Sequence, residues 1–150
     1  MISVDFFGCK RDLIATCCWE QACNRFLCIG ITIPDTSALT SLSEVLTRSN
    51  AFSTKPVHLS VEPFRELSDD LQTVIRYASV ENLMDAGARW AQLLPWTILD
   101  TNPMDLAGFL LNLQSLIQGP GREDNSIFLL VESGVSPYPN SLLGPFRGDS

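Results

Sequence analysis

The residues best suited to chemistry in this sequence are its five cysteines, all of which lie between Cys9 and Cys28. A thiolate can attack a substrate or bind a metal ion, so such a cluster can mark a catalytic site, a zinc site or a disulfide framework. Zinc ligands usually come in pairs about two to four residues apart. The adjacent Cys17 and Cys18 cannot both face one ion from a regular helix, and an odd number of cysteines argues against a disulfide framework.

The favoured interpretation is that these cysteines pack in the core. Cys17 and Cys18 continue the helical spacing of the apolar residues before them, and Cys28 lies inside a short apolar segment. Free cysteine is among the residue types most often buried. A small enzyme with a cysteine nucleophile paired to His58, the single histidine, is the catalytic alternative. No Gly-x-Ser-x-Gly, His-Glu-x-x-His or phosphate-loop motif is present.

Carboxylates form the second chemical group and give the chain its net charge of −7. Residues 1–65 contain six acidic and six basic side chains, whereas residues 66–150 contain eleven acidic and four basic ones, so the second part carries the whole excess. Proteins bind nucleic acids and anionic membranes through clustered lysine and arginine side chains. The charge therefore predicts neither of these as a partner and favours a basic protein or a cation. The alternative interpretation is that the acidic surface only keeps the protein soluble.

The leading hypothesis is a non-enzymatic acidic protein that binds a basic protein partner, as an immunity or antitoxin-type inhibitor does. The predicted contact residues are four acids on helix faces and one aromatic anchor: Asp69, Asp70, Glu81, Asp85 and Trp96. Two interpretations of Trp96 stay open. It follows Pro95 at a helix end, so it can be a partly exposed interface residue, although a core position is favoured.

A calcium-binding regulatory protein is the alternative. Its candidate ligands are the carboxylates of two short acidic segments, Asp100, Asp105, Glu123 and Asp124. The sequence has no EF-hand loop, which would be a specific calcium signal. Asp105 is also explained as an acid that stabilises the first turn of a helix. Apart from calcium, no cofactor is expected.

The elements that would position these residues follow from hydrophobic periodicity. Alternating or uninterrupted apolar residues predict strands at 2–7, 26–33, 57–61 and 126–132. Apolar stripes with helical spacing predict helices at 10–25, 35–46, 63–78, 80–94 and 103–118, with a hairpin as the alternative for 10–25. Ser79 and Asn102 are the predicted N-caps of the last two helices. The uninterrupted apolar run of the last strand predicts a central strand covered on both faces.

Together these elements predict an α/β or α+β fold, with about four strands in one mixed sheet and about five helices packed on it. Residues 1–133 should form a single globular domain, followed by an irregular tail at 134–150 with three prolines and three glycines. No apolar stretch approaches the about 20 residues of a membrane span. The first residues lack a basic region followed by an apolar segment, so a cytoplasmic protein is expected.

Overall fold

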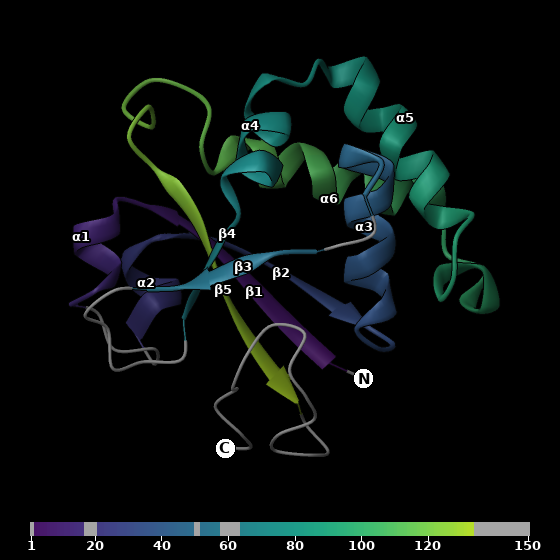
Figure 1. Ribbon diagram of the computed structural model, residues 1–150, viewed down its shortest axis with the longest axis horizontal. Helices are drawn as coiled ribbons and strands as arrows, with labels where there is room; N and C mark the ends of the chain where they lie inside the picture. Colours follow the sequence, from purple (N-terminus) through teal and green to yellow (C-terminus); the bar gives the residue numbers. More distant parts are fainter. Residues whose placement is uncertain (1, 17–20, 50–51, 58–63, 134–150) are drawn as a thin grey trace.

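The structure, a computed structural model, describes residues 2–16, 21–49, 52–57 and 64–133. Its strands form one sheet in the order β2-β1-β5-β4-β3 (Figure 1). Their bounds are β1 Ile2–Cys9, β2 Leu27–Ile33, β3 Thr54–Pro56, β4 Arg65–Leu67 and β5 Ser126–Ser133. The predicted combination of one sheet with packed helices is confirmed. The predicted tail at 134–150 lies outside the described residues.

Every neighbouring pair of strands is antiparallel, so the prediction of a mixed sheet is wrong. The segment at 10–25 explains part of the difference, because its favoured prediction is one helix. The structure instead has two short helices, α1 Arg11–Ile14 and α2 Ala22–Arg25, at the end of the sheet where β1 stops and β2 starts (Figure 1). Strand β2 therefore runs back antiparallel beside β1, whereas a single helix over 10–25 could cross the length of the sheet and return the chain parallel to β1.

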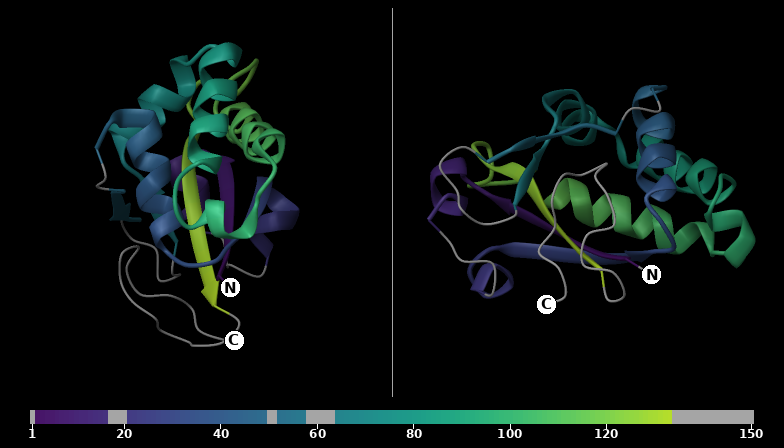
Figure 2. Two further views of the ribbon diagram at one scale, coloured as in Figure 1. Left: turned by 90° about the vertical axis from the view of Figure 1, so that its right-hand side faces the viewer. Right: turned by 60° about the horizontal axis from the view of Figure 1, so that its bottom comes forward.

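The remaining helices cover one face of the sheet, as the two views in Figure 2 show. They are α3 Ser37–Thr47, α4 Asp69–Tyr77, α5 Val80–Ala91 and α6 Pro103–Ser115, with a 3-10 turn, η2, at Trp96–Leu99 between α5 and α6. The predicted caps are confirmed: the Ser79 side chain accepts a hydrogen bond from the Asn82 N–H at 3.1 Å, and Asn102 Oδ1 accepts one from Met104 at 2.9 Å.

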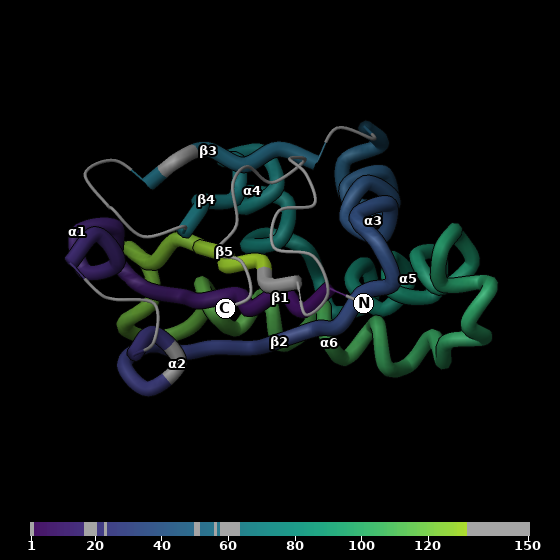
Figure 3. Tube along the Cα trace, turned by 90° about the horizontal axis from the view of Figure 1, so that it is seen from below, coloured from purple at the N-terminus to yellow at the C-terminus, as the bar shows by residue number. Residues whose placement is uncertain are grey.

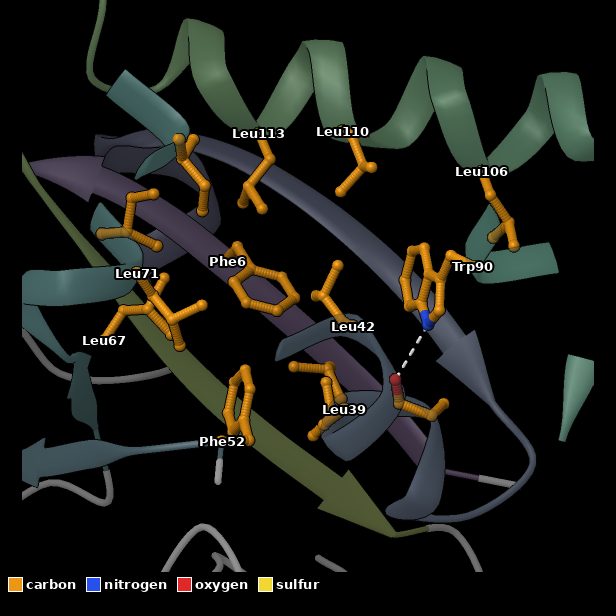
Figure 4. Close-up of a cluster of buried hydrophobic side chains, with 14 of the residues drawn as sticks. Phe6, Leu39, Leu42, Phe52, Leu67, Leu71, Trp90, Leu106, Leu110 and Leu113 are labelled. Carbon is orange, nitrogen blue, oxygen red and sulfur yellow. Dashed lines mark hydrogen bonds between the residues drawn. The ribbon is translucent and has the colours of Figure 1, made fainter. Parts of the chain in front are cut away.

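The sheet separates two clusters of buried apolar side chains. The larger cluster lies between the sheet and α3–α6 and contains Phe6, Leu39, Trp90 and Leu110 (Figure 4). The smaller cluster lies on the opposite face and includes Phe7, Cys9 and Ile14. Along β5, residues 127, 129 and 131 face the larger cluster, whereas 128 and 130 face the smaller one. The prediction that this central strand is covered on both faces is confirmed.

The helix predicted at 63–78 begins later than expected. Residues 65–67 form β4, which pairs with β5, and α4 starts at Asp69 after the cap Ser68, whose Oγ accepts a hydrogen bond from the Leu71 N–H at 3.4 Å. Phe64 and Leu67 are three residues apart, a spacing that fits a helix as well as two faces of a sheet. Of the strand predicted at 57–61, residues 58–61 lie outside the described residues, and β3 ends at Pro56.

Helices α5 and α6 touch along their backbones. A methyl group added at Gly87 would lie 2.5 Å from Ala107 Cα and 2.6 Å from Ala107 N, closer than atoms of this kind approach. Gly87 therefore sets the separation of the two helices. This close contact fixes the position of α5 against α6. The acidic residues of α5, Glu81 and Asp85, are exposed to solvent.

Candidate functional site

Two of the four predicted contact acids are already ion-paired. Asp69 Oδ1 accepts a hydrogen bond from Lys55 Nζ at 3.2 Å, and Asp85 accepts one from Arg89 Nε at 2.9 Å. Each pair is mostly exposed, so each adds no more than about 1 kcal/mol to stability. Their local charge is nevertheless largely neutralised, which leaves less of it for a partner.

The other two predicted acids, Asp70 and Glu81, are exposed, and no ion pair involves them within the described part of the chain. Asp70 lies in the first turn of α4 and Glu81 in the first turn of α5. Negative charge at these positions also interacts favourably with the helix dipole. The four acids therefore occupy the starts of two helices and the outer side of α5, and do not form one compact cluster.

Trp96 is buried, with 4% of its surface exposed. Its ring packs edge-on against Trp90, with 5.4 Å between the ring centroids, so the favoured core interpretation is the one that the structure supports. Trp96 therefore does not have the exposed position that an interface anchor needs, because its ring is not accessible. Within the described residues its buried Nε1 has no hydrogen-bond partner.

A surface hollow of about 620 Å³ lies between α3, α4 and α5. Apolar side chains such as Leu46 and Val74 line it together with Asp85 and Arg89. Tyr77, the last residue of α4, lines both this hollow and a second one of about 450 Å³. A third hollow of about 480 Å³ shares Arg48 and Val74 with the first and also has Asp70 in its lining. We call these three hollows together the α4 groove and define it by Arg48, Asp70, Val74, Tyr77, Asp85 and Glu123.

Tyr77 is the most accessible aromatic side chain of the groove, with 78% of its surface exposed. An aromatic ring between two hollows is the arrangement expected of an interface anchor, since tyrosine buries a large area and loses little conformational entropy. The sequence contains a signal that indicates the exposure of Tyr77. Tyr77 departs from the apolar stripe of α4, whose buried members are Leu71 and Ile75.

The charges along the α4 groove are mixed. Arg89 is engaged with Asp85, and its Nη2 also donates to the Val45 carbonyl at 3.4 Å. Arg76 donates to the carbonyls of Ile117 and Asn125. These two guanidinium groups tie helices and turns together. Their hydrogen bonds therefore stabilise the fold.

The most buried charge in the described residues is the carboxylate of Glu66 on β4. Arg11 Nε donates to the two carboxylate oxygens of Glu66, at 3.0 and 2.9 Å. Arg11 Nη2 lies 2.8 Å from Glu66 Oε2. This hydrogen bond and the attraction of the carboxylate raise the pKa of Arg11 above its ordinary value. Gln72 Nε2 approaches the same carboxylate at 3.4 Å.

Gln72 extends this network into the sheet. Its Nε2 donates to the Leu67 carbonyl at 2.7 Å, and its Oε1 accepts the Ile127 N–H at 3.0 Å. The network joins α1, the β4–α4 connection and β5. Its polar atoms bond one another, so its chemistry is that of a structural junction and not of a reactive carboxylate.

Removing the two partners of this pair should have unequal effects. Arg11→Met leaves the Glu66 carboxylate, only 5% exposed, without its cation, whereas Glu66→Gln leaves an Arg11 side chain that is 61% exposed and can be solvated. We expect a loss of about 2 kcal/mol in unfolding free energy for Arg11→Met and about 1 kcal/mol for Glu66→Gln. Urea unfolding followed by circular dichroism measures both, and equal losses would contradict the structural argument.

The candidate calcium ligands lie at the two ends of α6. Asp100 and Asp105 flank its first residue, whereas Glu123 and Asp124 follow its last turn, before β5. Helix α6 has 13 residues and is therefore about 20 Å long. No group of three or more acidic, cysteine or histidine side chains that could hold a metal ion occurs among the described residues. Calcium binding stays a prediction from sequence.

The cysteine hypotheses are only partly accessible to the structure. Cys9 is buried and belongs to the smaller cluster, and the partly buried Cys28 packs against it, in agreement with the core interpretation. Cys17, Cys18 and the proposed catalytic partner His58 lie outside the described residues.

Comparison of the chain with models of known protein families, with curated proteins and with solved structures finds no match. No helix in the described ranges has the length and apolar character needed to cross a membrane.

Proposed function

We propose that this chain is a binding protein that recognises a basic protein partner through the α4 groove. The observation that carries the proposal is Tyr77, which is 78% exposed and lies between two hollows. Interfaces concentrate their binding free energy in a few such aromatic residues surrounded by contacts that exclude water. Tyr77 thus takes the role of aromatic anchor that was predicted for Trp96.

The charge of the partner follows from the electrostatics of the whole chain. The net charge is −7, and the exposed groups in or beside the groove without an ion pair inside the described ranges include three acids, Asp70, Glu81 and Glu123, and one base, Arg48. Long-range attraction speeds the encounter with an oppositely charged protein, whereas short-range packing sets the lifetime of the complex. An immunity or antitoxin-type inhibitor of a basic protein is the more specific form of this proposal.

The proposal predicts that Tyr77→Ala abolishes partner capture without destabilising the fold. Tagged wild-type and Tyr77→Ala proteins would be used as baits in extracts of the source organism, with quantitative mass spectrometry as the measurement. Val80→Ala is a matched control, because Val80 is also exposed, at 57%, and lies outside the groove. We expect one basic protein that is enriched by wild type and Val80→Ala and lost with Tyr77→Ala.

Calorimetry with the purified pair should then show binding weakened at least about tenfold by Tyr77→Ala, which corresponds to about 1.4 kcal/mol. In stopped-flow experiments, Asp70→Lys combined with Glu81→Lys should slow association more than it accelerates dissociation. If no captured protein distinguishes Tyr77→Ala from Val80→Ala, the α4 groove is not the binding surface.

A further inference from the structure

The two edges of the sheet are built differently. One edge is β3, whose three residues, Thr54–Pro56, include a lysine and a proline. Short length, lysine and proline are the usual features that prevent an edge strand from pairing with another chain. The other edge is β2, with the seven residues Leu-Cys-Ile-Gly-Ile-Thr-Ile and neither charge nor proline. Of these two edge strands, only β3 has the features that protect against pairing, as far as the described residues show.

Strand β2 pairs with β1 on one side along its whole length, from Leu27 opposite Gly8 to Ile33 opposite Ile2. No described strand pairs with its other side, and in Figure 3 it forms the border of the sheet opposite β3. Half of the backbone N–H and C=O groups of an edge strand point away from the sheet. In β2 they form a row that can bond another extended strand.

The larger core is also less completely covered next to β2. Ile29 and Ile31 are only partly buried, although both pack against that cluster. Ile29 lies opposite Phe6 on β1, and the half-buried Phe109 of α6 packs edge-on against Phe6 with 5.6 Å between the ring centroids. Apolar side chains added beside β2 would extend this core.

We propose that the occupant of this edge is a second copy of the chain, with the two β2 strands paired antiparallel about Gly30. In that register Ile29 lies opposite Ile31 of the other copy, and Gly30 opposite Gly30. All four positions with large apolar side chains (27, 29, 31 and 33) then face one another across the axis. The strand is thus complementary to itself, which is the requirement for a two-fold symmetric interface.

Charge limits where two copies can meet. Two chains with a net charge of −7 repel each other, so they associate most readily through surfaces with few acids. Strand β2 itself has no acidic residue, and the carboxylate placed against Gly30 is that of Asp5 on the neighbouring β1. The apolar cross-strand pairs of the two β2 strands would favour their association. The dimer leaves the α4 groove open, because α4 lies near β3 and β4 in Figure 3, at the other side of the sheet from β2.

Sedimentation velocity between about 1 and 200 µM tests the proposal, because a dimer must dissociate on dilution. We expect the wild type to pass from monomer to dimer in this range. Thr32→Lys adds a charge to an exposed position of β2 and should weaken dimerisation more than about tenfold. Thr97→Lys adds the same charge on the exposed surface of η2 and should leave dimerisation unchanged. A wild type that stays monomeric, or equal effects of both lysines, would overturn the proposal.

A crosslink tests the register itself. In the proposed dimer Thr32 lies opposite Cys28 of the other copy, so Thr32→Cys should form a disulfide-linked dimer under mild oxidation, since opposed residues have Cα atoms about 5 Å apart. Within one chain the two positions are four residues apart on a strand, about 13 Å, which is too far for a disulfide. The crosslink should disappear when Cys28→Ser is added. A dimer in solution without this crosslink would place the interface elsewhere.

Discussion

Replacing Gly87 by alanine should lower the free energy of unfolding by about 3 kcal/mol, at the upper end of the range for overpacked positions. The new methyl group would lie 2.5–2.8 Å from three atoms of Ala107, two of them backbone atoms. Neither helix can yield by rotating a side chain, so α5 and α6 must move apart. Urea unfolding monitored by tryptophan fluorescence measures the loss.

Gly108→Ala is the matched control on α6. An added methyl group there meets nothing within 4 Å, so only the intrinsic helix preference changes, and that favours alanine by up to about 1 kcal/mol. The same chemical change should therefore have opposite signs at two neighbouring helix positions. Stabilisation by Gly87→Ala would show that the two helices are less closely packed than described.

Replacing Trp90 by alanine should cost about 3–5 kcal/mol, the range for large aromatic residues in a core. Trp90 is completely buried, and its Nε1 donates to the Ala38 carbonyl at 3.0 Å (Figure 4). The same N–H also lies 3.1 Å from Ser41 Oγ. The indole therefore joins α5 to the start of α3 in addition to filling the core. Thermal and urea unfolding would measure the loss.

Phenylalanine substitutions separate the hydrogen bonds from the packing. Trp90→Phe removes the donor for two oxygens on α3, whereas Trp96→Phe removes an N–H that has no partner among the described residues. Both shorten a buried indole, so Trp90→Phe should cost about 1–2 kcal/mol more than Trp96→Phe. The reverse order would indicate that Trp96 has a partner that the described residues do not include.

Local signals predicted most of the secondary structure. Ser79 and Asn102 cap helices where their side chains were expected to, and five consecutive apolar residues correctly indicated a central strand. These features depend on neighbours in sequence, which is why they could be predicted. The strand β4 could not, because its three residues become a strand through pairing with β5.

The surface was harder to predict than the core. Trp96 follows a helix-ending proline, which suggested exposure, yet the ring turns back against Trp90. Asp69 and Asp85 are predicted to contact a partner, but Lys55 and Arg89 lie close enough to neutralise them. The partner of Asp69 comes from another element, so the pair depends on the folded arrangement. Hydrophobic periodicity carries no information about such contacts.

The position of β5 also has a consequence for the order of assembly. It joins the β1–β2 pair to the β4–β3 pair, yet in sequence it follows all four of those strands. During synthesis on the ribosome the two pairs have no connecting strand until residues 126–133 emerge. Until then the edges of β1 and β4 that pair with β5 lack their neighbour, so this is the stage at which a chaperone would be most useful.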